Sequence, residues 1–283
     1  MSDDRAGLDD VDSRPGSVTS LVRTVLGTHL RDLGGWVAVA DLVRLLEALD
    51  VPADSTRVAV GRLKTRGVLV AEPRDGRSGY ALSGRAASML ERGDTRIFGP
   101  GAGPDDGWLL VSFSIPEDRR GDRHQLRRQL AWAGCGTVSS GLWVAPAHRA
   151  SDVDAVVDGL GLRDHVTTFA CREVGTPVPL VDVVRRWWDL DAVAARHLAF
   201  LDAHADSPEP SDGRASFVHL ARLVDAWRTI PSLDPGLPPH LLPPDWPGTR
   251  SLALVATARA HHLPPARAWV RDLVRPSRPT IPR

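Results

Sequence analysis

Cysteine is scarce in this sequence, because Cys135 and Cys171 are the only two among 283 residues. They lie far apart, and neither has a second cysteine or a histidine at the spacing of a zinc site. This argues against a disulfide framework and a cysteine-based metal centre. We expect two free, buried thiols.

Long apolar runs are also missing, although 42% of the residues are hydrophobic. No run reaches the roughly 18 to 20 residues that a membrane-spanning helix needs, so we expect no contact with a membrane. Residues 1–16 carry five acidic residues and two arginines, without the apolar stretch of a signal peptide. We expect them to form a disordered acidic tail on a cytoplasmic protein.

The common catalytic motifs are absent as well. The sequence has no P-loop, no dinucleotide-binding fingerprint and no G-x-S-x-G. His197 and His204 are seven residues apart on one predicted helix, whereas metal-binding pairs on a helix usually lie four apart. We expect them, like His261 and His262, to face solvent or the core. The chain is therefore expected to be no enzyme and to hold no cofactor or metal.

Charge is balanced overall but unevenly placed. Lysine and arginine together number 35, as do aspartate and glutamate. Between residues 55 and 96, however, nine basic residues stand against four acidic ones. Because the distribution of charge matters more than its sum when the partner is a polyanion, this segment is the first candidate for a nucleic-acid surface.

The length predicts two or three domains, each with its own core. Stretches rich in glycine or proline at 99–107 and 176–180 predict linkers. The predicted division is a tail 1–16, a first domain 17–98, a linker 99–107, a central domain 108–175 and a C-terminal domain 176–283.

The first domain has the element order of a winged helix-turn-helix. Its predicted elements are a helix 17–32, a short strand 36–39, a helix 40–50, a third helix beginning near residue 54, strands 68–72 and 79–82 around a turn, and a helix 83–93. Ser17 is a suitable N-cap for the first helix, and Gly34 and Gly35 end it. Helical spacing predicts that this helix buries either His29 or Leu30.

The third helix is the predicted DNA-reading element. Its buried stripe consists of Thr56, Ala59, Val60 and Leu63. The opposite side then carries Arg57 and Arg62, whose guanidinium groups match guanine in a major groove. The candidates for phosphate contacts are Ser55 and Lys64 of this helix, and Arg74 and Arg77 of the hairpin. A helical hairpin on a β-ribbon, with a basic face that is merely solvated, is the alternative.

The central domain predicts a ferredoxin-like βαββαβ plan. Its predicted elements are a strand 108–115, a helix 123–134, two strands within 136–146, a helix 151–162 and a strand 165–174. The second and fourth strands of this plan occupy opposite edges, so Cys135 and Cys171 should be unable to form a disulfide.

The C-terminal domain is predicted to be α-helical. The predicted helices are 181–205, 213–230, 251–262 and 265–274. Between them, 231–248 has too many prolines for a helix or a central strand and should wrap the surface. The fold class is therefore a multidomain α+β protein.

The succession of motifs resembles the PaaX family, bacterial repressors of phenylacetic acid catabolism. The resemblance rests on LGTHLRDLGGWVAVADLVRLLEALDV, RVAVGRLKTRGVLV, RSGYALSGRA, WLLVSFSIPEDRRGDRHQLRRQL, GLWVAP, RRWWDLDAVAARHLAFL and LPPHLLPPDWPG. It runs from about residue 17 to residue 275. One departure is Gly61, where the resemblance leads us to expect serine.

The resemblance implies a homodimeric transcription factor that binds double-stranded DNA and releases it when an aryl-CoA or acyl-CoA ester such as phenylacetyl-CoA binds. Cations and an apolar slot for such an effector are offered by Arg185, Arg186, Trp187 and Trp188. A tryptophan pair beside arginines is also typical of domain packing, and this alternative stays open.

The resemblance further implies a central domain similar to small CRISPR-associated nucleases, so a metal-dependent nuclease is the alternative function. Such an enzyme needs a carboxylate near the end of the first strand. That strand has none, and the nearest acids are Asp106 and Glu117. We therefore expect this domain to serve dimerisation and coupling. A winged-helix interaction module without a ligand is a third possibility.

Overall fold

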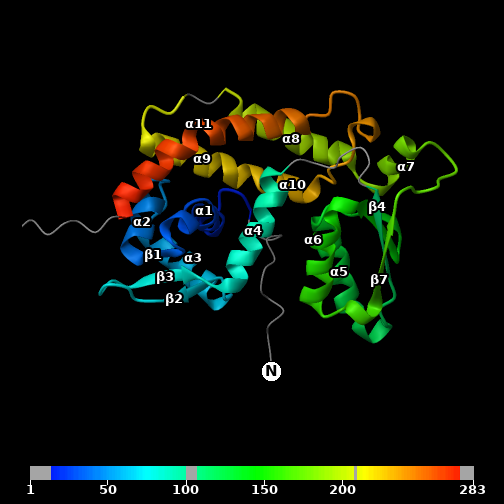
Figure 1. Ribbon diagram of the computed structural model, residues 1–283, viewed down its shortest axis with the longest axis horizontal. Coiled ribbons are helices and arrows are strands. Elements are labelled where there is room, and N and C mark those ends of the chain that lie inside the picture. Colours follow the sequence, from blue (N-terminus) through cyan, green and yellow to red (C-terminus); the bar gives the residue numbers. More distant parts are fainter. Residues whose placement is uncertain (1–13, 100–106, 207–208, 275–283) are drawn as a thin grey trace, which may run out of the picture. The chain divides into compact units, whose positions relative to one another are not determined.

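The computed structural model describes residues 14–99, 107–206 and 209–274 (Figure 1). Most of the predicted acidic tail and of the first linker lies outside these residues. The chain forms two units, each assembled from separate stretches of sequence. Of the described residues, the central unit contains Thr95–Ala203 and Arg228–Leu252, and the N-terminal unit contains 14–94, His204–Trp227 and 253–274.

The N-terminal unit contains the predicted winged-helix elements. They are α1 (Val18–Val25), a π-helical turn (Leu26–Leu30), a 3-10 turn (Arg31–Leu33), β1 (Trp36–Ala38), α2 (Val39–Glu47), α3 (Ala53–Thr65), β2 (Leu69–Ala71), β3 (Gly79–Leu82) and α4 (Gly84–Phe98). The strands form an antiparallel sheet in the order β1-β3-β2. Helix α4 extends beyond its predicted end at residue 93, and its last residues belong to the central unit.

The first helix departs from prediction in its last turns. Ser17 caps it and Gly34 ends it with a φ of 75°, both as predicted. Between them, Leu26–Leu30 forms a π-helical turn, which takes up more residues than an α turn. As a result His29 and Leu30 are both buried, each with 2% exposure, whereas the predicted regular helix buries only one of them.

Two helices from the C-terminal part of the chain complete the core of the winged helix. They are α9 (Gly213–Trp227) and α11 (Gly248–Val274). Phe217 of α9 and Val270 of α11 are buried in the same cluster as the leucines of α1, α2 and α3. Helix α9 lies along α1 (Figure 1).

Asp225 joins α9 to the beginning of α1. Its Oδ1 accepts hydrogen bonds from the hydroxyls of Ser20 at 2.5 Å and Thr24 at 2.8 Å, and its Oδ2 accepts one from the backbone N–H of Gly16 at 2.7 Å. The residue is 1% exposed. Three donors therefore replace the water that this carboxylate loses on burial.

The central unit has the predicted ferredoxin-like plan. Its elements are β4 (Trp108–Phe113), α5 (Arg120–Trp132), β5 (Gly136–Ser139), β6 (Leu142–Pro146), α6 (Ala150–Leu160) and β7 (Val166–Cys171). The antiparallel sheet has the order β5-β6-β4-β7. Cys135 precedes one edge strand and Cys171 ends the other, and both are free thiols, as predicted. Cys135 is buried, whereas Cys171 is only partly buried.

Alternate residues of β4 enter two different cores, as the two-residue repeat of a strand requires. Leu109, Val111 and Phe113 pack under α5 and α6, which cover one face of the sheet (Figure 1). Trp108 and Leu110 point to the other face, where α7 (Leu180–Trp187) packs. Both faces of the sheet are therefore covered.

Two helix boundaries predicted in the C-terminal part are wrong. The helix predicted over 181–205 is broken into α7 and α8 (Leu190–His204), because Trp188 is extended, with φ −126° and ψ 142°. The break predicted near residue 263 does not occur, because α11 continues through Pro264 and Pro265. Among the residues that the structure describes, no helix is long and apolar enough to cross a membrane.

The proline-rich segment 231–248 does not simply wrap the surface, so that prediction is also wrong. It contains the end of α10 (Ile230–Leu233) and a 3-10 turn (Pro239–Leu241). Leu237 and Leu241 are 4% and 5% exposed and belong to the core on the α7 side of the central sheet. The prolines here leave only short helical turns, but they do not prevent burial.

Candidate nucleic-acid interface

Helix α3 presents the predicted face to solvent. Its buried residues are Thr56, Ala59, Val60 and Leu63, the stripe that the helical spacing predicts. Arg57 and Arg62 lie on the opposite, exposed side. Val58 is 56% exposed between them, and an exposed methyl-bearing side chain can contact the methyl group of thymine.

The charged residues of α3 differ in how strongly they are held. Arg57 makes an ion pair with Asp54 one turn earlier at 2.8 Å, and both side chains are well exposed. Within the described part of the chain, no hydrogen bond or ion pair involves the side chains of Arg62 and Lys64, which are exposed. Ser55 is partly exposed at the beginning of the helix. Within α3, Arg62 and Lys64 are therefore more available to a polyanion than Arg57.

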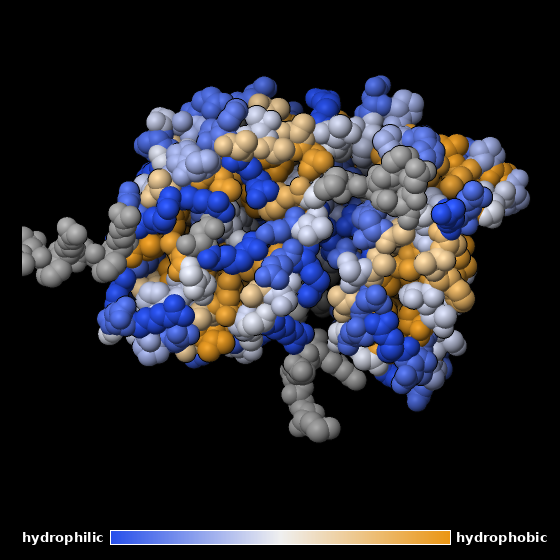
Figure 2. Space-filling view, viewed as in Figure 1, coloured by the Kyte–Doolittle hydropathy of each residue, from blue (hydrophilic) through white to orange (hydrophobic). Residues whose placement is uncertain are grey.

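The β2–β3 hairpin, hereafter the wing, has a tight turn at its tip. Asp75 and Gly76 both have positive φ angles, 49° and 71°, between the bridged residues Arg74 and Arg77. This is the turn that an Asp-Gly pair favours. Hydrophilic side chains cover the tip (Figure 2).

Trp36 anchors the wing to β1. Its indole N–H donates to the carbonyl oxygen of Glu72 at 2.7 Å, and its ring lies where a Cβ on Gly79 would be. Arg74 stacks over the same ring at 5.6 Å and pairs with the Glu72 carboxylate at 2.7 Å. The guanidinium of Arg74 is thereby fixed at the side of the wing while 43% of its side chain stays exposed.

Arg77 ties the wing to α2. It makes an ion pair at 2.8 Å with Asp41, which is 1% exposed, and Arg44 contacts the same carboxylate oxygen. A groove of about 470 Å³ lies beside this pair and is lined by Ala38, Val39, Ala40, Val43, Arg57, Arg77 and Ser78. One groove therefore brings together Arg57 of the helix and Arg77 of the wing, two of the predicted DNA-contacting residues.

The predicted effector residues separate into exposed and packed side chains. Arg185 and Arg186 of α7 are exposed, and Trp187 is partly buried. Trp188 is 6% exposed, and its N–H donates to the carbonyl oxygen of Gly134 at 2.9 Å. Its ring covers Gly136, where a Cβ would lie 2.6 Å from it. Trp188 therefore has a packing role within the central unit.

The residues weighed for nuclease chemistry are not gathered into a metal site. Asp106 lies outside the described residues, and Glu117 forms an exposed ion pair with Arg123 at 2.7 Å. Over residues 14–99, 107–206 and 209–274, no group of three or more His, Cys, Asp or Glu side chains is arranged to hold a metal ion.

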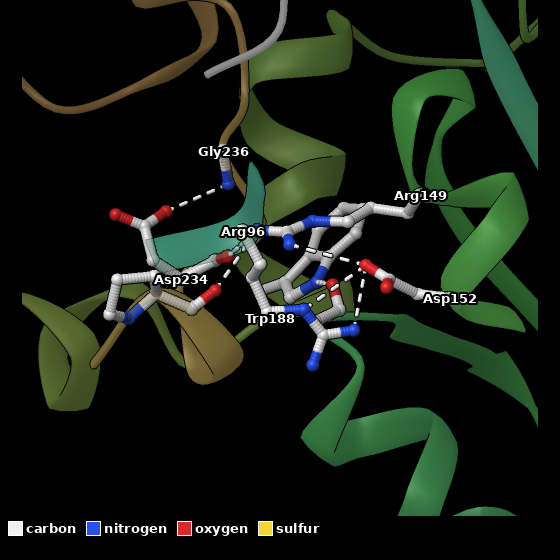
Figure 3. Close-up of polar contacts among 8 residues, drawn as sticks. Arg96, Arg149, Asp152, Trp188, Asp234 and Gly236 are labelled. Atoms are coloured by element: carbon white, nitrogen blue, oxygen red, sulfur yellow. Dashed lines mark hydrogen bonds and ion pairs between the residues drawn. The ribbon is translucent and has the colours of Figure 1, made fainter. Parts of the chain in front are cut away.

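A buried polar cluster in the central unit has no counterpart in the sequence predictions (Figure 3). Arg149, 5% exposed, donates to the carbonyl oxygens of Pro231 at 3.0 Å and Asp234 at 2.8 Å. Asp152 accepts from Arg96 at 2.6 Å and lies 3.5 Å from Arg149. The cluster thus holds the segment after α10 against the beginning of α6.

Burial shapes the protonation of this cluster. It lowers the pKa of Arg149, and the nearby charge of Arg96 adds to the effect. Burial also raises the pKa of the Cys135 thiol to about 12. Burial alone would raise the pKa of Asp234. Hydrogen bonds from His197 and from the backbone N–H of Gly236 outweigh burial, so the pKa of Asp234 is lowered. Nothing in the local sequence around Arg149 distinguishes it from an exposed arginine.

Comparison with known proteins identifies the family that has this architecture. Residues 17–86 match the family described as PaaX-like protein, residues 102–180 the PaaX protein central Cas2-like domain, and residues 188–272 the PaaX-like protein C-terminal domain. The chain belongs to the PaaX-like family. The predicted family and fold class, with an N-terminal winged helix, a Cas2-like α/β domain and a helical C-terminal domain, are thereby confirmed.

Two relatives show how far the PaaX-like similarity extends. The chain is 28% identical over 279 residues to the Transcriptional repressor PaaX of Escherichia coli strain K12. This alignment covers 93% of this chain and 85% of that protein. It is also similar to a solved structure, the uncharacterized protein Rv0674 from Mycobacterium tuberculosis. That likeness has a TM-score of 0.57 and 25% identity, and it covers 88% of this chain and 96% of the other.

Proposed function

We propose that this PaaX-like protein is a cytoplasmic transcriptional repressor that binds double-stranded DNA through α3 and the wing and has no enzymatic activity of its own. The observation that carries the proposal is the exposed basic face of α3, beside a wing whose arginines Arg74 and Arg77 are held in place by protein contacts. The relation to the Escherichia coli repressor supports it.

We propose three roles for the predicted DNA contacts. Arg62, which is exposed and makes no hydrogen bond or ion pair with the described side chains, is proposed to read a base in the major groove, together with Arg57. Ser55 and Lys64 are proposed to contact phosphates, as is Arg74 from the wing. The remaining wing arginine, Arg77, pairs with the buried Asp41, so we assign it mainly to positioning the wing.

The test begins with the selection of a binding sequence from a pool of random DNA duplexes. Affinity for the selected duplex is then measured by fluorescence anisotropy. Arg62→Ala should weaken binding by about 1 to 3 kcal/mol and relax the preference at one base pair. Lys64→Ala should weaken binding to all sequences and lower the slope of log affinity against log salt by about 1.

Arg196→Ala is the matched control, because Arg196 is an exposed arginine on α8 in the central unit. It should leave the affinity and the salt slope unchanged. The proposal fails if no sequence is enriched by the selection, or if Arg57→Ala and Arg62→Ala both bind with wild-type affinity.

We further propose a homodimer that recognises two inverted half-sites, as two-fold symmetry requires. The edge strand β7 supports this assembly. Its central residues are exposed, and Phe169 has 52% of its surface in solvent. An exposed edge strand with an apolar side chain is suited to pairing with a second strand.

We also propose that an aryl-CoA or acyl-CoA ester such as phenylacetyl-CoA releases the DNA. Arg185, Arg186 and Trp187 are the proposed effector contacts, because they keep exposed surface. The fourth predicted residue, Trp188, is a poor test, since the loss of a buried tryptophan costs about 3 to 5 kcal/mol in stability by itself. The effector must bind the DNA-free arrangement more tightly, because equal affinity for both would shift nothing.

The effector proposal is tested by calorimetry with phenylacetyl-CoA on the wild type and on Arg185→Ala and Arg186→Ala. Both variants should bind more weakly and should need more ligand to release the selected duplex. Equal heats for all three proteins would remove α7 from the effector site. The DNA-binding proposal would then still stand, because it is measured without the ligand.

A further inference from the structure

A cavity of about 280 Å³ lies between the end of the first helix and α11, within the N-terminal unit. Its walls are formed by His29, Leu33, Arg267, Val270 and Arg271. None of these residues belongs to α3 or the wing, so the cavity is separate from the candidate DNA surface. The π-helical turn Leu26–Leu30 brings His29 into its wall.

His29 is a buried polar group that the fold does not satisfy. Its side chain is 2% exposed, and among the described residues neither Nδ1 nor Nε2 has a hydrogen-bond partner. Phe217 packs against the ring at 5.3 Å between centroids and holds it in place. Buried polar atoms in native proteins are nearly always paired. An unpaired ring in the wall of a cavity therefore indicates a ligand with polar atoms.

The protonation state of His29 defines what it offers such a ligand. Burial, together with the positive charge of Arg267, lowers the pKa of His29 to about 4. The ring is therefore neutral near pH 7, with one N–H donor and one acceptor nitrogen. It can hydrogen-bond a ligand but supplies no positive charge.

Positive charge comes from the arginines of α11. Arg267 and Arg271 both line the cavity, and the Nε of Arg271 donates to the carbonyl oxygen of Arg267 at 3.3 Å. Burial lowers the pKa of Arg259, and the charge of Arg267 adds to this effect while the charge of Asp94 opposes it. Nearby Asp94 pairs with Arg31 at 2.5 Å. This wall of the cavity therefore favours an anion.

The rest of the cavity is apolar and small. Leu33 and Val270 form apolar walls opposite a polar group, which is the usual construction of a small-molecule site. The volume is near the lower end of the roughly 300 to 1,000 Å³ of ligand cavities. It suits a single ring or a short chain with one anionic group and is too small for a whole coenzyme A ester.

We propose that this cavity is a binding site for a small monocarboxylate with a compact apolar body. The carboxylate lies against Arg267 and Arg271 and accepts a hydrogen bond from His29, while the apolar body packs on Leu33 and Val270. The ligand is held by the first helix of the winged helix and by α11 at the same time.

The test uses isothermal titration calorimetry on the full chain without DNA, so its failure is independent of the proposed repressor function. The probe is benzoate, with benzamide as its uncharged analogue and inorganic phosphate as an anion without an apolar body. Benzoate should saturate at one molecule per chain. Benzamide and phosphate should each bind at least about tenfold more weakly, because each lacks one half of the recognition.

Two variants locate the binding. Arg271→Gln removes an exposed cation from the cavity rim and should weaken benzoate at least about tenfold. Arg250→Gln is the matched control, since it makes the same change at an exposed position on the same helix outside the cavity, and it should leave benzoate binding unchanged. His29→Phe should lose benzoate binding and keep a cooperative thermal transition, because an apolar ring replaces buried unpaired nitrogens.

Four results would overturn the proposal. They are the absence of saturable benzoate binding to the full chain, binding of benzamide as tight as that of benzoate, unchanged binding by Arg271→Gln, and equal weakening by Arg250→Gln. Each can be obtained from a folded protein, because both arginines are exposed.

Discussion

Gly61 occupies the exposed face of α3 for a reason that the folded chain does not provide. Its φ is not in the left-handed region, and a Cβ added there would meet no atom within 4 Å. A glycine inside a helix costs about 1 kcal/mol relative to alanine. Packing does not require a glycine here, and we propose that Gly61, between the two proposed base-reading arginines, allows a DNA backbone to approach closely.

Gly61→Ala should raise the free energy of unfolding by about 1 kcal/mol and lower the affinity for the selected duplex. Chemical denaturation and fluorescence anisotropy measure the two effects. Gly159→Ala in α6 is the matched control, because a Cβ there also meets nothing, and it should stabilise the protein without changing affinity. Unchanged DNA affinity in Gly61→Ala would contradict the close approach of a DNA backbone to Gly61.

His29 should make the protein sensitive to acid. Its pKa is lowered from 6.5 to about 4 by burial and by Arg267, so the unfolded chain binds a proton between these values while the folded chain does not. The stability that depends on neutral His29 is present above about pH 6.5 and is lost as the pH falls toward 4, by up to about 3 kcal/mol.

His29→Phe should therefore show a weaker loss of stability between pH 7.5 and pH 5 than the wild type, as measured by urea denaturation. Some loss should remain, because the pKa values of His204 and His219 are also lowered by burial and by neighbouring histidines. His240→Gln, a change at an exposed histidine, is the control, and its stability should depend on pH as that of the wild type does. Parallel curves for His29→Phe and wild type would contradict the argument.

At the scale of elements, the wing depends on the contact between Trp36 and Gly79. A Cβ on Gly79 would lie 2.2 Å from the Trp36 ring, so the ring would have to move. Its hydrogen bond to Glu72 and its stacking with Arg74 would then be lost. The strand pairing of β3 and the direction of the wing are coupled through this one side chain.

Gly79→Ala should lower stability by about 1 to 3 kcal/mol, as overpacking does, and should weaken DNA binding at temperatures where the protein is still folded. Thermal denaturation measures the loss of stability, and fluorescence anisotropy below the melting temperature measures the DNA affinity. The control variant Gly84→Ala, at the first residue of α4, adds a Cβ in open space. It should change neither the stability nor the DNA affinity. Equal DNA affinity of folded Gly79→Ala and wild type would show that the wing does not contact DNA.

The elements that the sequence predicted best are those with an unambiguous period. The buried stripe of α3 from Thr56 to Leu63 matches its prediction residue by residue, because a solvent-facing helix keeps one regular apolar side. The predictions failed where tertiary contacts override local preference. Trp188 breaks a helix to bury its ring on Gly136, and α11 continues through Pro264 and Pro265.

At the scale of the whole molecule, the two edges of the central sheet are not equivalent. Strand β5 has four residues and a register shift between Thr137 and Ser139. Strand β7 has six residues in unbroken register with β4. Because bulges and short edges discourage strand pairing, β7 is the edge on which the proposed homodimer should form.

Phe169→Lys should convert the dimer into a monomer, because it places a charge on this edge. Size-exclusion chromatography with light scattering measures the mass, and circular dichroism checks the fold. Val138→Lys makes the same change on the opposite edge, where Val138 is 37% exposed, and should leave the dimer intact. A dimer that survives Phe169→Lys and dissociates with Val138→Lys would assign the interface to β5.

The sequence by itself determined the order of helices and strands from α1 to β7, the basic face of α3 and the strand order that keeps Cys135 and Cys171 apart. These follow from periodicity and turn residues, which act over a few positions. Only the tertiary structure decided the buried environments of His29 and Arg149. Arg149 donates to residues about 80 positions later in the chain, and His29 is buried against a helix from the C-terminal part without any hydrogen-bond partner among the described residues. Local sequence does not specify which distant groups will surround a buried side chain.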